Sequence, residues 1–126
     1  MSYQAYQSAQ RQAESPRELE YRLFAQVTRA LLEAEAAGRE NLPKLVDAVD
    51  WNRRLWSALA TDCSDPGNAL GQAARAQIIS LSLFVGRYSS DVIQHGAELE
   101  PLIDINRTIM QGLAGQRGGP PAEAAA

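Results

Sequence analysis

The chain has 126 residues, of which 45% are hydrophobic and 21% are charged. This size and composition are typical of one globular domain that buries a core without disulfides or metals. The net charge is −3 and Lys44 is the only lysine. Without a run of basic residues, the sequence argues against a protein that binds nucleic acid directly.

The chain offers few residues for catalysis or for a cofactor. A zinc site takes three or four ligands, and Cys63 and His95 are the only cysteine and histidine, so we expect no metal and no cofactor. A Cys63–His95 pair is compatible with the composition, but Cys63 continues an apolar stripe and the sequence favours a protein that is not an enzyme. The first twelve residues lack the apolar core of a signal peptide, and no cysteines can pair, which together indicate the cytoplasm and no membrane.

Two helices are predicted before residue 40. Residues 3–13 have tyrosines and alanines at near-helical spacing, which predicts a short first helix. Ser15 and Pro16 are typical of a helix start, so a second helix is expected from there to about Ala37. Gly38 is a suitable residue to end it.

A third helix is expected from Asn41–Pro43 to about Asp62. Its main apolar face is made of residues at helical spacing: Leu42, Leu45, Val46, Val49, Trp56, Leu59 and Cys63. Trp51 and Leu55 lie on the opposite side. They form either a second core contact or an exposed anchor for a partner, since tryptophan is common in binding hot spots.

Residues 72–94 form the most apolar segment, and the fold is expected to be organised around it. One face carries residues at core spacing: Ala74, Ile78, Leu81, Val85, Tyr88 and Val92. A second face carries Ile79, Leu83 and Ile93, beside a row of the small residues Ser82, Gly86 and Ser90. A helix that is apolar nearly all round is expected to be buried on several sides. The row of small residues would let another helix, from this protein or from a partner, approach closely.

The last helix is expected from Glu98–Pro101 to Ala114, and residues 115–126, rich in Gly, Pro and Ala, are expected to be disordered. The sequence thus predicts an all-α fold: a small helical bundle of about five helices around a central apolar helix, in one domain over residues 1–114. Asn106 lies inside the apolar stripe of this last helix. It either fixes register with buried hydrogen bonds or is left for a ligand. Arg53 is expected to pair with Asp104 or Glu100.

Several strings resemble the FlaF family of flagellar biosynthesis regulators. They are MSYQAYQ at the start, WNRRLW at 51–56, IISL at 78–81 and LIDINRTIMQGL at 102–113. The resemblance covers nearly the whole chain, from about Tyr3 to Leu113. It implies a small cytoplasmic helical protein that acts with the regulator FlbT in making and exporting flagellin.

The resemblance implies a flagellin-binding chaperone and positive regulator of flagellin synthesis and secretion. The alternative is a helical adaptor that regulates flagellin translation only through FlbT or flagellin mRNA. The oligomeric state stays open. The residues expected to bind a partner are Trp51, Arg53, Leu55, Ile79, Leu83, Asn106, Arg107 and Met110.

Overall fold

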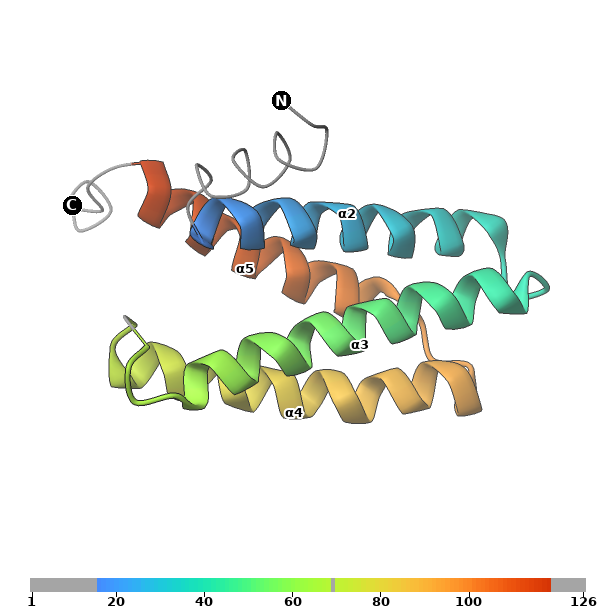
Figure 1. The fold of residues 1–126 in the computed structure, drawn as a ribbon. Helices are drawn as coiled ribbons and strands as arrows, with labels where there is room; N and C mark the ends of the chain where they lie inside the picture. Colours follow the sequence, from blue (N-terminus) through green and yellow to red (C-terminus); the bar gives the residue numbers. More distant parts are fainter. Residues whose placement is uncertain (1–15, 69, 119–126) are drawn as a thin grey trace, which may run out of the picture.

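The computed structural model describes residues 16–68 and 70–118, with side chains for 18–68 and 70–112, and this part of the chain is helical without strands. Its elements are α2 (Pro16–Ala37), α3 (Leu42–Ser64), α4 (Gln72–His95) and α5 (Glu100–Gly118) (Figure 1). The all-α prediction is confirmed. The described part holds four helices rather than about five, and the predicted first helix at residues 3–13 lies outside it.

The helix ends follow the local signals in the sequence. Asn41 caps α3 by accepting a hydrogen bond from the backbone N–H of Lys44 at 3.4 Å, with a proline in the first turn. Gly38 and Gly96 end α2 and α4 with φ of +87° and +74°, a left-handed conformation that glycine adopts without steric cost. The predicted bounds of these helices are therefore confirmed to within a few residues.

The last helix is longer than predicted. α5 runs to Gly118, so residues 115–118 are helical rather than part of a tail. A glycine within a helix lowers its stability by only about 1 kcal/mol relative to alanine, which does not end the helix by itself. The rest of the predicted tail, residues 119–126, lies outside the described residues.

The order in space differs from the prediction that residues 72–94 are central. α3 packs against α2 on one side and α4 on the other, and α5 packs mainly against α2 (Figure 1). α4 touches α5 only weakly and lies along one edge of the bundle. The prediction of a central α4 is wrong because, among the described helices, α3 occupies the middle, and these helices cover only one of the two apolar faces of α4.

The core lies where α2, α3 and α5 meet. Phe24 and Trp56 pack edge to face there, with ring centroids 5.4 Å apart and both side chains fully buried. α4 adds Ile78, Val85 and Val92 from its inner face. The residues of the predicted inner face therefore do reach the core, although the helix itself is peripheral.

Candidate partner-binding surface

A buried polar network joins α2, α3 and α5. Asn106 Oδ1 accepts a hydrogen bond from Trp56 Nε1 at 2.8 Å. Asn106 Nδ2 donates to Asn52 Oδ1 at 2.7 Å and to Thr28 Oγ1 at 3.1 Å. The Thr28 hydroxyl in turn donates to Met110 Sδ at 3.9 Å. Each hydrogen bond joins two different helices, so the network fixes how the three helices are aligned.

This network changes the role of one predicted site residue. The Asn106 side chain is fully buried and its oxygen and nitrogen both have partners, so a ligand has no access to it. Its inclusion among the partner-binding residues is not supported, because the register role accounts for all of its contacts. Within the network only Asn52 Nδ2 is without a hydrogen-bond partner.

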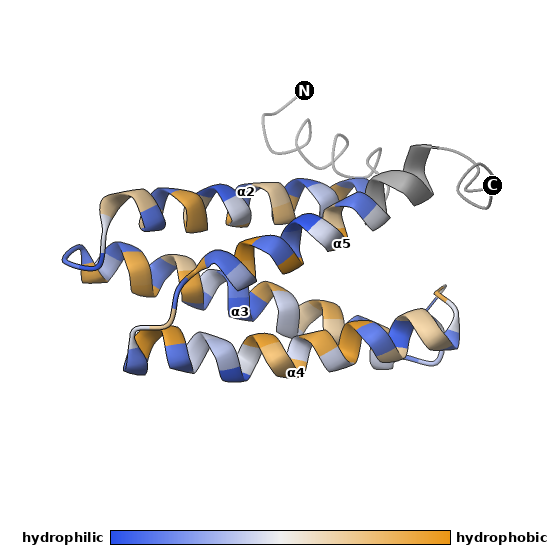
Figure 2. Ribbon diagram, turned by 180° about the vertical axis from the view of Figure 1, so that it is seen from behind, coloured by the Kyte–Doolittle hydropathy of each residue, from blue (hydrophilic) through white to orange (hydrophobic). Residues whose placement is uncertain are grey.

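The outer side of α4 is an exposed apolar surface. Leu83 is 60% exposed, Phe84 is 38% exposed and Ile93 is 37% exposed. Figure 2 shows apolar residues recurring along α4 at the edge of the bundle. Phe84 stacks on Tyr88 with ring centroids 5.4 Å apart, whereas Ile79 is half-buried. The second face predicted for residues 72–94 is therefore confirmed at Leu83 and Ile93, which no described helix covers, whereas Ile79 packs against the core.

Beside this face, a hollow of about 320 Å³ lies between α3 and α4. We call it the α3–α4 hollow, and it is lined by Val46, Asp47, Val49, Asp50, Arg53, Ser89, Ser90, Ile93 and Gln94. Val46 was expected in the core but is 37% exposed.

Ser89 is 2% exposed and its Oγ has no hydrogen-bond partner. Ser89 was not among the predicted site residues. The sequence signal that could have identified Ser89 is its position four residues after Val85, which places it on the same, buried face of α4.

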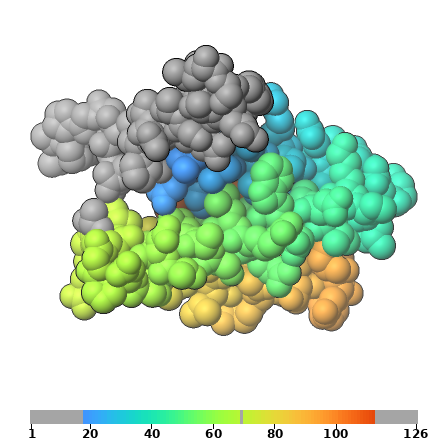
Figure 3. Space-filling view, viewed as in Figure 1, coloured from blue at the N-terminus to red at the C-terminus, as the bar shows by residue number. Residues whose placement is uncertain are grey.

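Figure 3 shows the face on which α3 and α4 are both visible, with α4 along the lower edge. Three charged residues of α3 at or near the hollow form ion pairs with one another: Asp50, Arg53 and Arg54. Asp50 accepts a hydrogen bond from Arg53 Nη2 at 2.5 Å and forms an ion pair with Arg54 Nε at 3.1 Å. The hydrogen bond from Arg53 holds the pKa of Asp50 below its ordinary value, with the charge of Arg54 acting in the same direction. The expectation that Arg53 pairs with Asp104 or Glu100 is wrong, because Asp50 is one helical turn away.

The remaining predicted site residues divide between surface and core. Trp51 is 38% exposed on α3, while Leu55, one turn later, is half-buried against the core. Arg107 is exposed on α5 and Met110 is half-buried there. Neither residue lines the α3–α4 hollow. Of the predicted site residues, Arg53 lines the α3–α4 hollow. Ile79 and Leu83 lie on α4, the helix that forms one side of the hollow, and Arg107 and Met110 lie on α5, away from it.

The suggested Cys63–His95 pair does not form. The Cys63 carbonyl accepts a hydrogen bond from Arg75 Nε at 2.7 Å, which places Cys63 at the start of α4. His95 lies in the last turn of that helix, about 30 Å further on at 1.5 Å per residue, and pairs with Asp91 at 3.3 Å. Over residues 16–68 and 70–118, no group of three or more metal-ligating side chains was found.

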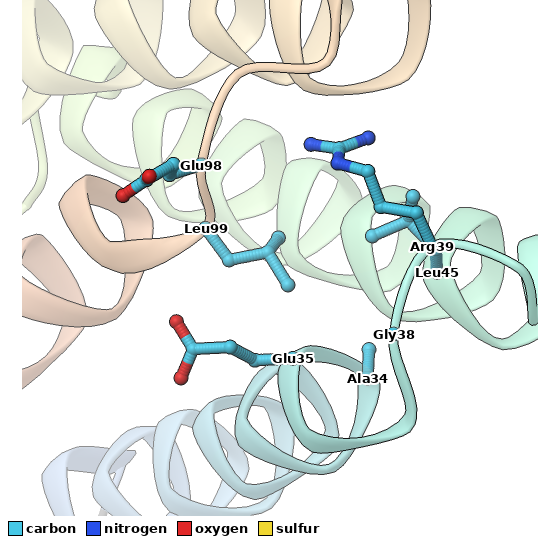
Figure 4. A pocket seen from close by; sticks show the side chains of 7 residues that line it. All are labelled: Ala34, Glu35, Gly38, Arg39, Leu45, Glu98 and Leu99. Atoms are coloured by element: carbon cyan, nitrogen blue, oxygen red, sulfur yellow. The ribbon is translucent and has the colours of Figure 1, made fainter.

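A second hollow, of about 300 Å³, lies where the α2–α3 and α4–α5 connections meet (Figure 4). Arg39 donates to the carbonyl oxygens of Val92, at 3.1 Å, and of Ala97. Figure 4 shows the Leu99 side chain between Glu35 and Arg39. Arg39 thus supplies hydrogen bonds to carbonyl oxygens at the end of α4. We therefore interpret the hollow as the place where the two connections pack together, and not as a ligand site.

Comparison with known proteins supplies the family. The family model described as flagellar protein FlaF matches residues 2–113. Searches of curated proteins and of solved structures gave no match. Among the residues that the structure describes, no helix is long and apolar enough to cross a membrane. Because the match spans most of the 126 residues, the chain belongs to the FlaF family of flagellar proteins.

Proposed function

We propose that this protein is a cytoplasmic, flagellin-binding chaperone and a positive regulator of flagellin synthesis and secretion, acting together with FlbT. Membership of the FlaF family supports a flagellar role. The observation that supports a chaperone in particular is the uncovered apolar side of α4, with Leu83 at its centre. Exposed apolar surface of this kind is typical of a binding site.

The proposed ligand is an amphipathic segment of unassembled flagellin. Such a helix presents apolar side chains at i, i+3, i+4 and i+7, which match a groove between two helices. Leu83, Ile93 and Val46 supply apolar contacts along α4 and the facing rim of α3. Covering the segment removes its apolar surface from water and prevents it from associating with other flagellin chains.

Two residues of α3 are proposed to contribute at the edge of this site. Trp51 offers an exposed indole on the outer side of α3, and half-exposed tryptophans are typical anchors in interfaces. Arg53 lines the α3–α4 hollow and is exposed. Its guanidinium has further N–H donors beyond the one that meets Asp50, so it can bind a carbonyl or carboxylate of the partner.

The test is isothermal titration calorimetry of the purified protein with flagellin, and separately with FlbT. We expect saturable binding to flagellin that Leu83→Glu weakens at least about tenfold, because a charge replaces an apolar contact. Leu32→Glu is the matched control, since Leu32 is a 37% exposed leucine on α2, away from the hollow. Its affinity should stay within about twofold of the unmodified protein.

Absence of saturable binding to flagellin contradicts the chaperone proposal. Binding to FlbT alone supports the adaptor function instead. Binding to flagellin leader RNA that weakens steeply with salt supports a direct role in translation, which the net charge of −3 argues against.

A further inference from the structure

We propose that residues 3–13, the N-terminal segment, fold back as a helix along the side of α2 and α3 that faces away from α5, and compete there with flagellin for Trp51. The inference rests on the proposed function only for that competition. The packing itself follows from the surface of α2 and α3, from the point at which the segment joins α2, and from the spacing of its apolar residues.

An apolar strip runs along α2 and α3 on the side opposite α5. We call it the α2–α3 strip, and its members recur at helical spacing: Leu19, Leu23 and Ala30 on α2, and Trp51, Leu55 and Ala58 on α3. Leu19 is 36% exposed and Trp51 is 38% exposed, while Leu55 is half-buried. The large side chains at both ends of the strip are therefore open to a further contact.

The hydrogen bonds of Asn106 show on which side of α2 and α3 the helix α5 lies. Asn106 donates to Thr28 on α2 and to Asn52 on α3, so α5 covers the side of the pair that carries these two residues (Figures 1 and 2). At about 100° per residue, Ala30 lies roughly 160° round α2 from Thr28. The α2–α3 strip is therefore on the side that α5 leaves open.

The strip also lies away from α4 and from the charged outer side of α2. Trp51 is about 160° round α3 from Arg53, which lines the α3–α4 hollow. The outer side of α2 carries the exposed residues Arg22, Arg29 and Glu33. A helix with an apolar face that packs beside α2 therefore fits the strip, and not the charged side.

The N-terminal segment joins α2 at one end of this strip. Pro16, the first residue of α2, is three positions before Leu19. The residue before a proline disfavours the helical conformation, so a helix in the segment ends before Ser15 and the chain turns there. Two helices joined by so short a connection are antiparallel neighbours. The segment therefore runs back along α2, from the Leu19 end of the strip toward Trp51.

The length of the segment matches the distance to Trp51. Its eleven residues make a helix about 16 Å long at about 1.5 Å per residue. The Phe24–Trp56 contact shows that residues of α2 and α3 are level when their numbers sum to about 80, so Trp51 is level with residue 29. From Leu19 to that level is about 15 Å along α2. The segment therefore spans the strip from end to end.

The two tyrosines of the segment come level with the two large residues of α3 in the strip. With the turn just before Pro16, a segment residue is level with the α3 residue about 50 positions later. Tyr6 then lies within one residue of the level of Leu55, and Tyr3 within two residues, about 3 Å, of the level of Trp51. A tyrosine ring placed there buries apolar area on the strip while its hydroxyl stays in water.

This packing regulates access to Trp51. The N-terminal segment and an amphipathic helix of flagellin both place apolar side chains on the same indole, so only one of them occupies it at a time. A site that is free in only a fraction of the molecules binds with an affinity reduced by that fraction. The N-terminal segment therefore lowers the affinity for flagellin, and flagellin displaces it on binding.

The first experiment tests the packing by disulfide formation in a Cys63→Ala background. Ala9→Cys with Ala58→Cys should form a disulfide within one chain on mild oxidation, because the register brings these two positions level and together. Ala9→Cys with Ser57→Cys is the matched control. Ser57 is exposed like Ala58 but lies about 100° round α3 from it, so this pair should link at least about tenfold more slowly. Mass spectrometry after alkylation counts the free thiols of the monomer.

The second experiment measures access to Trp51 by acrylamide quenching of tryptophan fluorescence. The other tryptophan of the chain is fully buried, so a change in quenching reports Trp51. Tyr3→Glu/Tyr6→Glu should raise the quenching constant about 1.5-fold or more, because a charge on the apolar face of the segment releases it from the strip. Gln4→Glu/Ser8→Glu adds the same charge to the opposite face of the segment and should leave quenching unchanged.

Three results overturn the packing: a test cysteine pair that links no faster than the control pair, disulfides that form between chains instead of within one, or quenching that Tyr3→Glu/Tyr6→Glu leaves unchanged. None of these results depends on flagellin. Linking between chains would assign the strip to a second copy.

The competition is tested by calorimetry with flagellin. Tyr3→Glu/Tyr6→Glu should raise the affinity at least about threefold, and the oxidised Ala9→Cys/Ala58→Cys variant should bind more weakly until it is reduced. An affinity that neither change alters overturns the competition and leaves the packing intact. Absence of flagellin binding in a protein whose segment links to α3 contradicts only the chaperone function.

Discussion

The indole Nε1 of Trp56 on α3 donates a hydrogen bond to Asn106 Oδ1 on α5 at 2.8 Å, and both side chains are fully buried. These residues are 50 positions apart in the chain. The pair anchors a network that also includes Asn52 and Thr28, so one amide supports contacts among three helices. Its removal should therefore affect the whole bundle.

Asn106→Leu should lower the free energy of unfolding by roughly 3 kcal/mol. The substitution leaves the N–H of Trp56 and the side-chain oxygen of Asn52 buried without a partner, and each such group costs about 1–3 kcal/mol. Urea denaturation measures the loss. Arg107→Ala, at the exposed neighbouring position, should change stability by less than about 0.5 kcal/mol. Equal effects of the two variants would contradict a structural role for the network.

Gly96→Ala should destabilise the protein by about 1 kcal/mol, because φ is +74° at this position and a Cβ is strained in that conformation. Gly112→Ala should do the opposite and add about 0.5–1 kcal/mol. Gly112 lies within α5, without a positive φ, and its Cβ would meet nothing within 4 Å. Thermal unfolding of the two variants should give melting temperatures on opposite sides of the unmodified protein.

The Cys63 thiol should resist modification and make stability depend on pH above about 9. Burial raises its pKa from the ordinary 9.0, and the charges of Glu20 and Asp62 add to this. The folded thiol keeps its proton where the unfolded one has lost it. The contribution to stability is thus complete below the unfolded pKa and is lost as pH rises through the folded pKa.

Urea unfolding at pH values from 7 upward measures this dependence, and the rate of reaction with a thiol reagent measures access. Stability should fall from about pH 9, and the fall should be smaller in Cys63→Ala. Burial also raises the pKa of Tyr88 above its ordinary 10.0, so a fall that remains in the variant at higher pH belongs to that residue. Rapid labelling of the folded protein at neutral pH would contradict burial of Cys63.

Trp51→Ala should weaken flagellin binding by about tenfold or more, as expected for a hot-spot residue, while the protein stays folded. Trp56→Ala is the comparison, because that side chain is fully buried and its loss should cost about 3–5 kcal/mol of stability. Calorimetry gives the affinity and thermal unfolding gives the stability. If Trp51→Ala lowered stability strongly and did not lower affinity separately, Trp51 would be a core residue and not a binding anchor.

Local signals in the sequence were sufficient for the helices and most of their ends. Pro16 and Asn41 marked helix starts, and Gly38 and Gly96 marked ends, because these signals depend on residues next to each other in the chain. The end of α5 was missed by four residues, since glycines near Ala114 weaken a helix without stopping it. The periodicity also separated the buried Ile78, Val85 and Val92 of α4 from the exposed Leu83 and Ile93, although Ile79 packs against the core.

The family was also accessible from the sequence, because strings such as WNRRLW and LIDINRTIMQGL are continuous in the chain, and the family match over residues 2–113 agrees with them. These strings contain Trp56 and Asn106. Their periodicity alone left open whether Asn106 serves a ligand or the core, since either role requires the same polar residue on an apolar face.

Tertiary structure decided what surrounds each helix. An apolar pattern on all sides of residues 72–94 predicted a central helix, but a pattern records which faces avoid water and not whether a neighbour covers them. The neighbours depend on how α2, α3 and α5 pair, and the hydrogen bonds of Asn106 and the Phe24–Trp56 contact fix that pairing across distant parts of the chain. These contacts place α3 in the middle and α4 at the edge, with Leu83 exposed.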